Sequence, residues 1–587
     1  MKQKRVLWIL ILFILIFLVL IIRIGMIQFV EGSVLGHNLK EEAYKSQTLS
    51  QIITPKRGII YDATGNKILA MSASVETITI SPTRIENEDK EKVALAFSEI
   101  FELNYDEVLA KVKSENSIQT IAKKVDKEKT DELRKWMTTN KLYSGINIDE
   151  DSKRFYPYNN LASNLIGFCG VDGEGRDGIE YYFDDILKGN VGKIVTATNA
   201  VGQVIPIGEE QYVKAQNGSD IVLSIDAHIQ TIVEENLKAA CKENECLNGG
   251  NIIIMDPKTG DVLAMATYPD YNLNTPSIPV AEEIIEGFDK LNEDEQIDAL
   301  IRMWRNRAIS DGYEPGSTFK VLDAAIALEE GVFTADNVGD LDCEGFEEVE
   351  DWHINCWRYL NPHGELSLRT ALMNSCNPGF IQTGSAIGVD RMCRYLKAFG
   401  IMDRTGIELP GEYGGLFFDK EDIGPVELAT LSMGQRFELT PLQLVTAISA
   451  LGNDGVLMKP RVVKQVINSE TKAVQNIEPT KVRQVVSKET ANLVLDMMRS
   501  GVDDGIAYRG AVAGYSVAGK TGTAEMGTAD ERYTASFVGI APVSSPKVTI
   551  LVSLYDPTGD SGFQGGALAA PVASNILAQI LPYLENM

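Results

Sequence analysis

The chain has 587 residues, of which 44% are hydrophobic and 23% are charged, and this length requires more than one hydrophobic core. Its 55 basic and 82 acidic residues give a net charge of −27. This balance argues against a nucleic-acid partner and against docking on anionic lipid through a broad basic surface.

The first apolar stretch is long enough to cross a membrane. The residues MKQKR precede an uncharged run from Val6 to Ile22, and about 17–25 apolar residues form a membrane-spanning helix. A cleaved signal peptide is the alternative, but it needs a shorter apolar core and a small-residue cleavage site, which the residues after Arg23 do not offer. The basic start keeps the N-terminus cytoplasmic. We therefore expect a single-pass protein of the cell membrane whose remaining chain forms an extracytoplasmic ectodomain.

The rest of the chain predicts an α+β fold in two further domains. Two segments with an Asp-x-x-Gly turn between apolar runs read as β-hairpins, and an acidic and basic stretch near 86–140 reads as a solvated helical insert. Late strands separated by turns favour an antiparallel sheet carrying helices. The hairpins are expected at 58–72 and 251–267, helices at 227–243 and 567–584, and strands at 221–226, 514–526, 534–543 and 548–556. We expect an anchor at 1–30, an N-terminal domain at 31–215 and a C-terminal domain at 216–587.

A serine and a lysine open one predicted helix. In EPGSTFKVLDAAIALEEG (314–331), Ser317 and Lys320 share a face of the first turn, and the apolar residues that follow predict burial. Burial favours the neutral form of a lysine, which can then accept the serine proton. Alone, this S-x-x-K pattern is a weak signal, since a helix can carry Ser and Lys in its first turn by chance.

Two further motifs follow it along the chain. Ser375-Cys376-Asn377 lies in MNSCNPGF, and Lys520-Thr521-Gly522-Thr523 lies in YSVAGKTGTAEM, a predicted strand. The combination of S-x-x-K, S-x-N and K-T-G is the signature of penicillin-binding proteins and class A β-lactamases. Three motifs in this order make coincidence improbable.

The sequence resembles a class B, monofunctional penicillin-binding protein, the D,D-transpeptidase of peptidoglycan synthesis in cell division, sporulation or elongation. The resemblance also rests on RGIIYD (57–62), GIEYYFDDILKG (178–189), DPKTGDVLAMATYPDYN (256–272) and GGALAAPV (565–572). It implies a penicillin-binding, β-lactamase-like transpeptidase domain on an N-terminal pedestal of the dimerisation type. Because no module for strand polymerisation fits upstream, it also implies a membrane glycosyltransferase or morphogenetic complex as partner.

The resemblance assigns a role to each motif residue. Ser317 attacks the penultimate D-Ala of a stem peptide, Lys320 is the base, and Ser375 passes a proton to the departing amine. Asn377 holds the donor backbone, Lys520 supplies positive charge, and Thr521 and Thr523 hold the terminal carboxylate. Gly522 lets the strand lie close to substrate. The backbone N–H groups of Ser317 and Thr523 form the oxyanion hole, and β-lactams acylate the same serine. No cofactor is needed for this chemistry.

Two other functions share parts of these features. A β-lactam sensor or β-lactamase would carry the same motifs, although a retained anchor and a long pedestal favour the transpeptidase. A scaffold that recruits a glycosyltransferase would need only the anchor and the pedestal, whereas this chain keeps every motif residue.

The seven cysteines predict a structural zinc site beside the second motif. Their odd number excludes a complete set of disulfides within one molecule. Cys343 and Cys356 lie between the first two motifs, Cys376 lies within the second, and His353 supplies an imidazole. His363 or Asp351 is an alternative fourth ligand. A Cys343–Cys356 disulfide and three free buried thiols are the competing interpretations.

Overall fold

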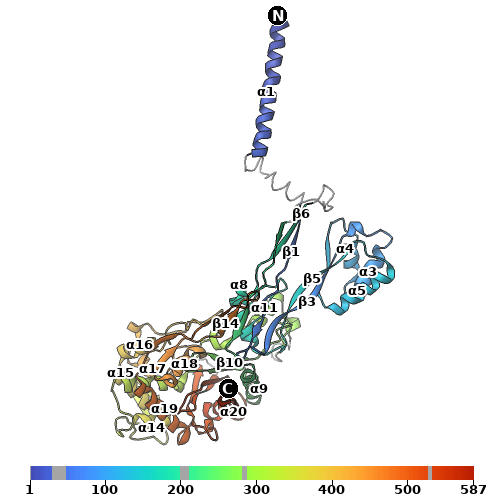
Figure 1. Ribbon diagram of the computed structural model, residues 1–587. Helices are drawn as coiled ribbons and strands as arrows, with labels where there is room; N and C mark the ends of the chain where they lie inside the picture. Colours follow the sequence, from blue (N-terminus) through green and yellow to red (C-terminus); the bar gives the residue numbers. More distant parts are fainter. Residues whose placement is uncertain (1, 30–47, 198–210, 281–286, 527–531, 587) are drawn as a thin grey trace. The chain divides into compact units, whose positions relative to one another are not determined.

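The computed structural model describes residues 2–29, 48–197, 211–280, 287–526 and 532–586 (Figure 1). The chain packs into two compact units, one formed by 1–56 with 189–217 and the other by 57–188 with 218–587. Among the described residues, the first unit contains one helix and a three-stranded antiparallel sheet of order β1-β6-β7. Its elements are α1 (Lys2–Phe29), β1 (Thr48–Ile53), β6 (Gly192–Ala197) and β7 (Gln211–Val213). The domain boundaries predicted from the sequence stay a prediction.

Helix α1 is long and apolar enough to cross a membrane, with a span from Val6 to Ile24 and a mean hydropathy of 3.3. Helix α20 (Gly565–Glu585) passes the same length and composition test in the second unit. Half of α20, however, is buried against the protein, which is the behaviour of a core helix. Within the described residues, α1 is therefore the candidate membrane anchor.

The second unit begins with a seven-stranded sheet of order β15-β14-β8-β2-β3-β4, with β5 paired to β3. The hairpin predicted at 58–72 is confirmed, because β2 pairs antiparallel with β3. The insert near 86–140 contains helices α3, α4 and α5, as expected, but also strand β4, which was not predicted. The elements are β2 (Ile60–Tyr61), β3 (Ile68–Ile80), α3 (Lys90–Phe101), α4 (Tyr105–Val112), β4 (Gln119–Val125), α5 (Lys127–Asn140), β5 (Ile146–Phe155), β8 (Asp220–Leu223), β14 (Val463–Ile467) and β15 (Val474–Asn476).

A buried carboxylate joins two of the stretches that carried the family resemblance. Glu180 is fully buried and pairs with Arg57 and Arg154, each at 2.6 Å. Arg57 belongs to RGIIYD and Glu180 to GIEYYFDDILKG. Burial alone would raise the pKa of Glu180, but the two guanidinium groups outweigh it and hold this pKa below its usual value. The ion pair between Arg57 and Glu180 thereby holds the first residue of this unit to the short helix 178–182.

The sheet that carries the third motif, which we call the catalytic sheet, has five antiparallel strands in the order β10-β9-β19-β18-β17. Its strands are β9 (Gly250–Met255), β10 (Val262–Tyr268), β17 (Ala518–Met526), β18 (Arg532–Ala541) and β19 (Val548–Tyr555). The predicted hairpin at 251–267 and the predicted late strands are therefore confirmed. Every residue of β19 is buried, because helices cover both faces of the sheet.

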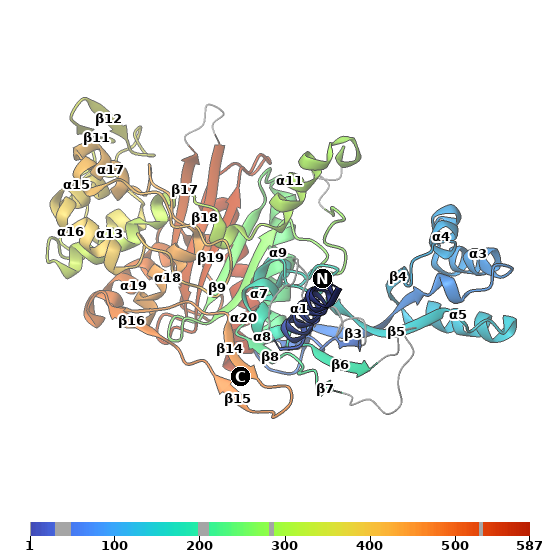
Figure 2. The same ribbon diagram turned by 90° about the horizontal axis from the view of Figure 1, so that it is seen from above.

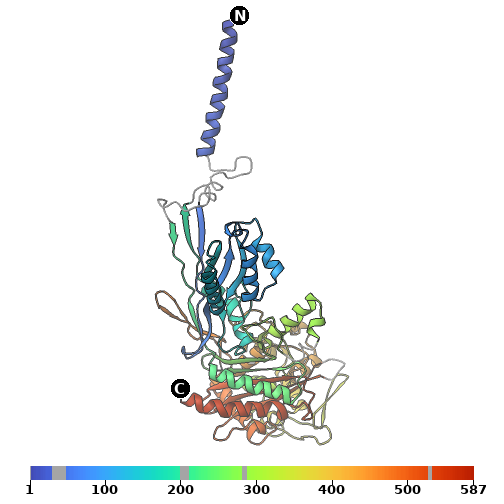
Figure 3. The ribbon, with the colours of Figure 1, turned by 90° about the vertical axis from the view of Figure 1, so that its right-hand side faces the viewer.

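Alternate residues of the sheet contribute to two separate cores. Ile252 and Ile254 face α9 (Ala227–Glu243) and α20, which lie side by side in Figure 3. Ile253 and Met255 belong to the other core, with the helices grouped on one side of the sheet in Figure 2. Those helices are α13 (Lys320–Glu329), α14 (Leu368–Met373), α15 (Asn377–Ile387), α16 (Val389–Ala398), α17 (Pro425–Ser432), α18 (Pro441–Ser449) and α19 (Lys488–Asp503).

Short elements complete the second unit. Two small antiparallel pairs, β11–β12 and β13–β16, lie outside the large sheets. The remaining helices and strands are α6 (Ser163–Ile166), α7 (Gly178–Tyr182), α8 (Asp184–Leu187), α11 (Glu293–Trp304), α12 (Arg307–Ser310), β11 (Phe346–Val349), β12 (Trp352–Asn355), β13 (Val456–Met458) and β16 (Lys481–Gln484). Together they confirm the predicted α+β class.

Candidate active site

Ser317 lies in a tight turn in front of a buried helix. A 3-10 turn (Gly316–Thr318) precedes α13, and the Thr318 hydroxyl donates to the carbonyl of Pro315 at 2.7 Å. Gly316 has φ +54°, and its N–H donates to the carbonyl of Gly434 at 2.8 Å. A side chain at 316 would be strained by this φ and would crowd the carbonyl of Thr523. The turn is thus fixed against the strand that carries the third motif.

Lys320 is the first residue of α13 and is completely buried. Its Nζ donates to the carbonyl of Ser375 at 3.1 Å and to Oδ1 of Asn377 at 2.7 Å. Burial lowers the pKa of Lys320 to about 8, against the opposing influence of nearby thiols and Asp323. A neutral amine has two hydrogens and one lone pair. The two acceptors use both hydrogens, so that the lone pair is left to accept a proton.

The second motif connects α14 to α15. Ser375 adopts a left-handed backbone with φ +52°, which is uncommon for a residue with a side chain and typical of functional turns. Its Oγ accepts a hydrogen bond from Nζ of Lys520 at 2.9 Å, which leaves its own proton free to be donated. Asn377 receives the bond from Lys320 on Oδ1 and donates through Nδ2 to the carbonyl of Asn355 at 3.2 Å.

The third motif lies on β17, at the end of the catalytic sheet. Lys520 is almost fully buried, and burial, together with repulsion from Lys320, holds the pKa of Lys520 well below its ordinary value. Thr521 and Thr523 share the opposite face of the strand and line the cleft. The Thr523 hydroxyl accepts from the N–H of Gly565 at 3.1 Å and so keeps its proton for a ligand.

Gly522 has a structural reason in addition to the predicted approach to substrate, which stays a prediction. A Cβ at this position would lie 2.4 Å from Oγ of Ser536 and 3.0 Å from the carbonyl of Pro315. The missing side chain therefore lets β17 pack against the turn that carries Ser317, rather than only against a substrate.

One cleft of about 540 Å³ brings the motifs together. Ser317, Ser375, Asn377, Thr521 and Thr523 all line it, while Lys320 and Lys520 lie buried behind the lining. Sequence reasoning missed the rim of the cleft, because no motif marks it. That rim includes the exposed residues Trp357, Tyr508, Arg509 and Phe563. Arg509 is the one charged side chain in the described lining of this cleft.

Comparison with known proteins agrees with this geometry. Residues 250–578 match the model of the penicillin binding protein transpeptidase domain, and residues 52–223 match that of the penicillin-binding protein dimerisation domain. The chain belongs to the penicillin-binding protein transpeptidase family. Membership brings the predicted α+β fold and serine-based acyl transfer, and it confirms the resemblance stated above.

Two curated relatives illustrate the range of this family. The chain is 34% identical to stage V sporulation protein D of Bacillus subtilis, over 99% of this chain and 86% of that protein. It is 28% identical to peptidoglycan D,D-transpeptidase FtsI of Escherichia coli K12, over 95% of this chain and 88% of that protein.

Solved structures show the same fold. Penicillin binding protein 2X of Streptococcus thermophilus superposes with a TM-score of 0.72 at 22% identity, over 91% of this chain and 80% of that one. Penicillin binding protein 3 of Mycobacterium, solved in complex with aztreonam, gives 0.67 at 25% identity, over 92% of this chain and 98% of that one.

This penicillin-binding protein also gathers three thiols and an imidazole beside its second motif. The cluster consists of Cys343, Cys356, Cys376 and His363, whose donor atoms lie within 4.8 Å of one another. Nδ1 of His363 lies 3.6 Å from the sulfurs of Cys343 and Cys356. The three cysteines are buried, and all seven cysteines, which lie in the described part of the chain, are free.

The structure places His353, the predicted fourth ligand, outside this cluster. His353 lies on β12, where its half-exposed ring stacks on Phe346 with centroids 4.1 Å apart. Residues three apart along an extended chain point to opposite sides, so His353 cannot share the side of Cys356. His363 reaches the cluster because the chain turns back after Cys356 and Gly364 pairs with Cys343 through two backbone hydrogen bonds. Asp351, the other alternative, is also outside the cluster.

Proposed function

We propose that this protein is a membrane-anchored D,D-transpeptidase that cross-links peptidoglycan stem peptides. The observation that carries the proposal is the pair of buried lysines on either side of Ser375, in the cleft that also holds Ser317. The substrate is inferred from the family, in which the E. coli relative is named a peptidoglycan D,D-transpeptidase.

Acylation begins at Ser317. Its oxygen forms a bond to the carbonyl carbon of the penultimate D-Ala, and its proton passes to the lone pair of neutral Lys320. The developing oxyanion is held by the backbone N–H groups of Ser317 and Thr523, and one such donor contributes roughly 3–4 kcal/mol to the transition state. The carbon–nitrogen bond then breaks, and the departing amine takes a proton from the Ser375 hydroxyl, which Lys520 orients. Ser375 regains a proton from Lys320, which carries the proton taken from Ser317, so that both groups return to their starting state.

The remaining motif residues position the donor peptide. Thr521 and Thr523 hold the terminal carboxylate with hydroxyl groups that face the cleft. The carboxylate also approaches Lys520, and a bound anion would favour the charged form of this buried amine. An amine of a neighbouring stem peptide attacks the acyl-enzyme, which forms the cross-link and releases Ser317.

Mass spectrometry after incubation with penicillin tests this assignment. We expect a long-lived adduct on Ser317 and none on Ser317→Ala. Rapid turnover of the drug would indicate a β-lactamase instead, and absence of an adduct on wild-type protein would contradict the active-site assignment. Rescue of a deletion strain by Ser317→Ala would favour a scaffold whose catalysis is dispensable.

The two matched domains, one for dimerisation and one for transpeptidation, suggest a partner that makes glycan strands. We propose that α1 spans the membrane with its basic N-terminus in the cytoplasm, which places the residues that follow α1 outside. Because the matched domains cover dimerisation and transpeptidation, a membrane glycosyltransferase would supply the glycan strands. Protease accessibility of the domains in intact spheroplasts tests the orientation, and co-purification with a glycosyltransferase tests the partner.

We also propose that the cluster of three cysteines and His363 holds one structural zinc ion. The donors match a closed tetrahedral Cys₃His site, which leaves no position for water. Cys376 lies between Ser375 and Asn377, and Trp357, next to Cys356, donates through Nε1 to the carbonyl of Asn374 at 2.9 Å. A metal here would pin the loop from 343 to 363 against the second motif.

The two histidines provide a matched test of the zinc proposal. Elemental analysis of the wild-type protein should give about one zinc per chain. His363→Ala should lose the metal and lower both the melting temperature and penicillin acylation, whereas His353→Ala should change none of the three. Cys376→Ser should behave like His363→Ala. Metal-free protein with full activity, or a Cys343–Cys356 disulfide in a peptide map, would contradict it.

A further inference from the structure

A second cavity of about 880 Å³ lies in the larger compact unit, apart from the catalytic cleft. None of its lining residues belongs to the three motifs. The walls come from the loop after α6, the start of α7, the end of α11, α12 and the loop 404–413. Its volume is in the range of cavities that hold small ligands, about 300–1,000 Å³.

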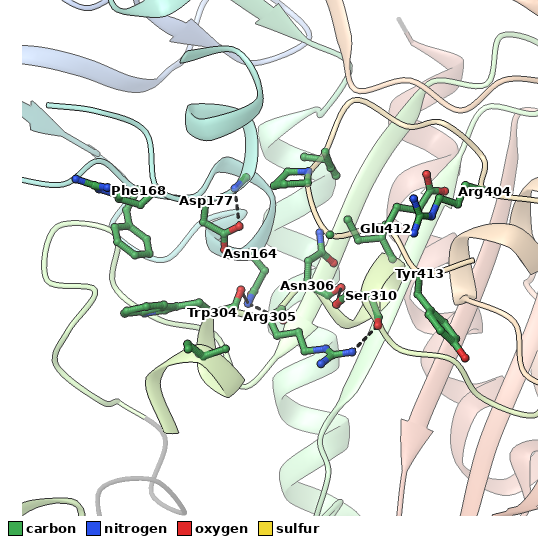
Figure 4. Close-up of a pocket in the computed structure, with 17 residues that line it drawn as sticks. Asn164, Phe168, Asp177, Trp304, Arg305, Asn306, Ser310, Arg404, Glu412 and Tyr413 are labelled. Atoms are coloured by element: carbon green, nitrogen blue, oxygen red, sulfur yellow. Dashed lines mark hydrogen bonds between the residues drawn. The ribbon is translucent and has the colours of Figure 1, made fainter. Parts of the chain in front are cut away.

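One side of this cavity is aromatic and rigid. Phe168 and Trp304 lie together on that side in Figure 4, with ring centroids 4.8 Å apart. The Trp304 indole is fixed, because Nε1 donates to the carbonyl of Pro276 at 2.8 Å. Flat apolar faces held in place suit the faces of sugar rings and aliphatic chains.

The opposite side carries a guanidinium group without a partner. Arg404 lies there next to Glu412 and above Tyr413 in Figure 4, is exposed, and makes no hydrogen bond or ion pair with any residue that the structure describes. The two other lining arginines are already neutralised, Arg305 by Asp311 and Arg176 by Asp172.

Among the described residues, neither carboxylate that lines the cavity forms an ion pair with Arg404. Both carboxylate oxygens of Glu412 accept hydrogen bonds within its own loop, from the N–H and hydroxyl of Thr405 and from the N–H of Gly406. Asp177 accepts from the N–H of Gly178. In a protein with a net charge of −27, a cavity that presents a free cation selects for an anion.

We propose that this cavity is a second, non-catalytic binding site for an acidic muropeptide, with a stem-peptide carboxylate on Arg404 and a sugar ring against Trp304. The choice of a muropeptide rests on the proposed function, since peptidoglycan supplies sugar rings and free carboxylates in one molecule. Ile309, which lines the cavity, accepts a backbone hydrogen bond from Tyr413 and lies eight residues before Ser317 in the chain. Between them, Tyr313 pairs with Leu439 through two backbone hydrogen bonds, so that the same segment runs from the cavity to the nucleophile. A strand held here would remain close to the enzyme between successive cross-links.

The test uses full-length protein whose Ser317 has first been acylated with penicillin, so that the catalytic cleft is blocked. A soluble disaccharide tetrapeptide is titrated and its dissociation constant measured by calorimetry. We expect saturable binding that weakens about tenfold in Arg404→Gln, the loss typical of a charge-assisted hydrogen bond. Arg404→Lys should recover part of the affinity. Arg84→Gln, which removes an exposed arginine elsewhere, should leave the affinity unchanged.

The choice of probe separates the two parts of the ligand. The free disaccharide and a muropeptide with amidated carboxylates should both bind much more weakly than the acidic muropeptide. Equal binding of the amidated probe, unchanged binding in Arg404→Gln, or no binding to the acylated protein would overturn the proposal. Failure of the proposed function would be seen separately, as an unlabelled Ser317 in the mass spectrum before any titration.

Discussion

The pH dependence of acylation tests the role given to Lys320. With its pKa lowered to about 8 by burial, about 9% of Lys320 is neutral at pH 7, against about 0.03% for an ordinary lysine. The buried position thus increases the reactive form about 300-fold. Because only the neutral amine can accept the Ser317 proton, the acylation rate should rise about tenfold from pH 6 to pH 7 and level off above about pH 9.

The assay is the rate of labelling by a fluorescent penicillin in stopped flow across this pH range. Lys320→Arg keeps the charge but cannot deprotonate, so it should lose acylation by about 10²-fold or more. Its melting temperature should be measured in parallel to show that the domain is folded. A rate that does not change between pH 6 and pH 9, or substantial labelling of Lys320→Arg near neutral pH, would refute the assignment of Lys320 as the base.

Three further substitutions follow from the packing. Gly522→Ala should lower the free energy of unfolding by about 1–3 kcal/mol and slow acylation, because the new methyl group overlaps Ser536; unchanged urea midpoints and acylation rates would contradict this. Glu180→Gln should cost about 3–5 kcal/mol in urea denaturation, because it leaves buried Arg154 without its anion and Arg57 with Asp184 alone, whereas the exposed Glu102→Gln should cost less than about 1 kcal/mol. The stabilisation by Glu180 is present at neutral pH and should be lost below about pH 4, because its pKa is lowered in the folded state. Arg509→Gln should raise the KM for stem peptides with a free side-chain carboxylate but not for amidated ones, and an equal change for both would exclude charge recognition.

The sequence was sufficient to predict the three motifs of the active site and most strands of the catalytic sheet. Three short motifs predict one site because each contains residue types that are rarely placed together without a chemical reason. The strands of the catalytic sheet were predicted because their apolar runs and turn residues are local signals. Strand β4 was missed, because a lysine-rich segment with few fully buried residues has a weak apolar alternation.

Long-range contacts explain what could not be predicted. Which histidine lies beside the cysteines depends on how the loop after Cys356 turns back to Cys343, and spacing along the chain favoured His353, which lies outside the cluster. The cation at the rim of the catalytic cleft, Arg509, and the unpaired Arg404 lie in loops without a motif. Their significance appears only when the neighbouring carboxylates can be counted in three dimensions.

The order of Asn377 and Pro378 has a consequence for the chemical lifetime of the site. The Asn377 carboxamide is used at both ends, since Oδ1 accepts from Lys320 and Nδ2 donates to Asn355. Hydrolysis to aspartate would place an anion beside the lysine and face the Asn355 carbonyl with another acceptor. Asparagine deamidates mainly when the backbone nitrogen of the next residue attacks its side-chain amide. The backbone nitrogen of Pro378 carries no hydrogen and cannot follow this route. The proline that begins α15 therefore also protects the amide next to it from spontaneous deamidation.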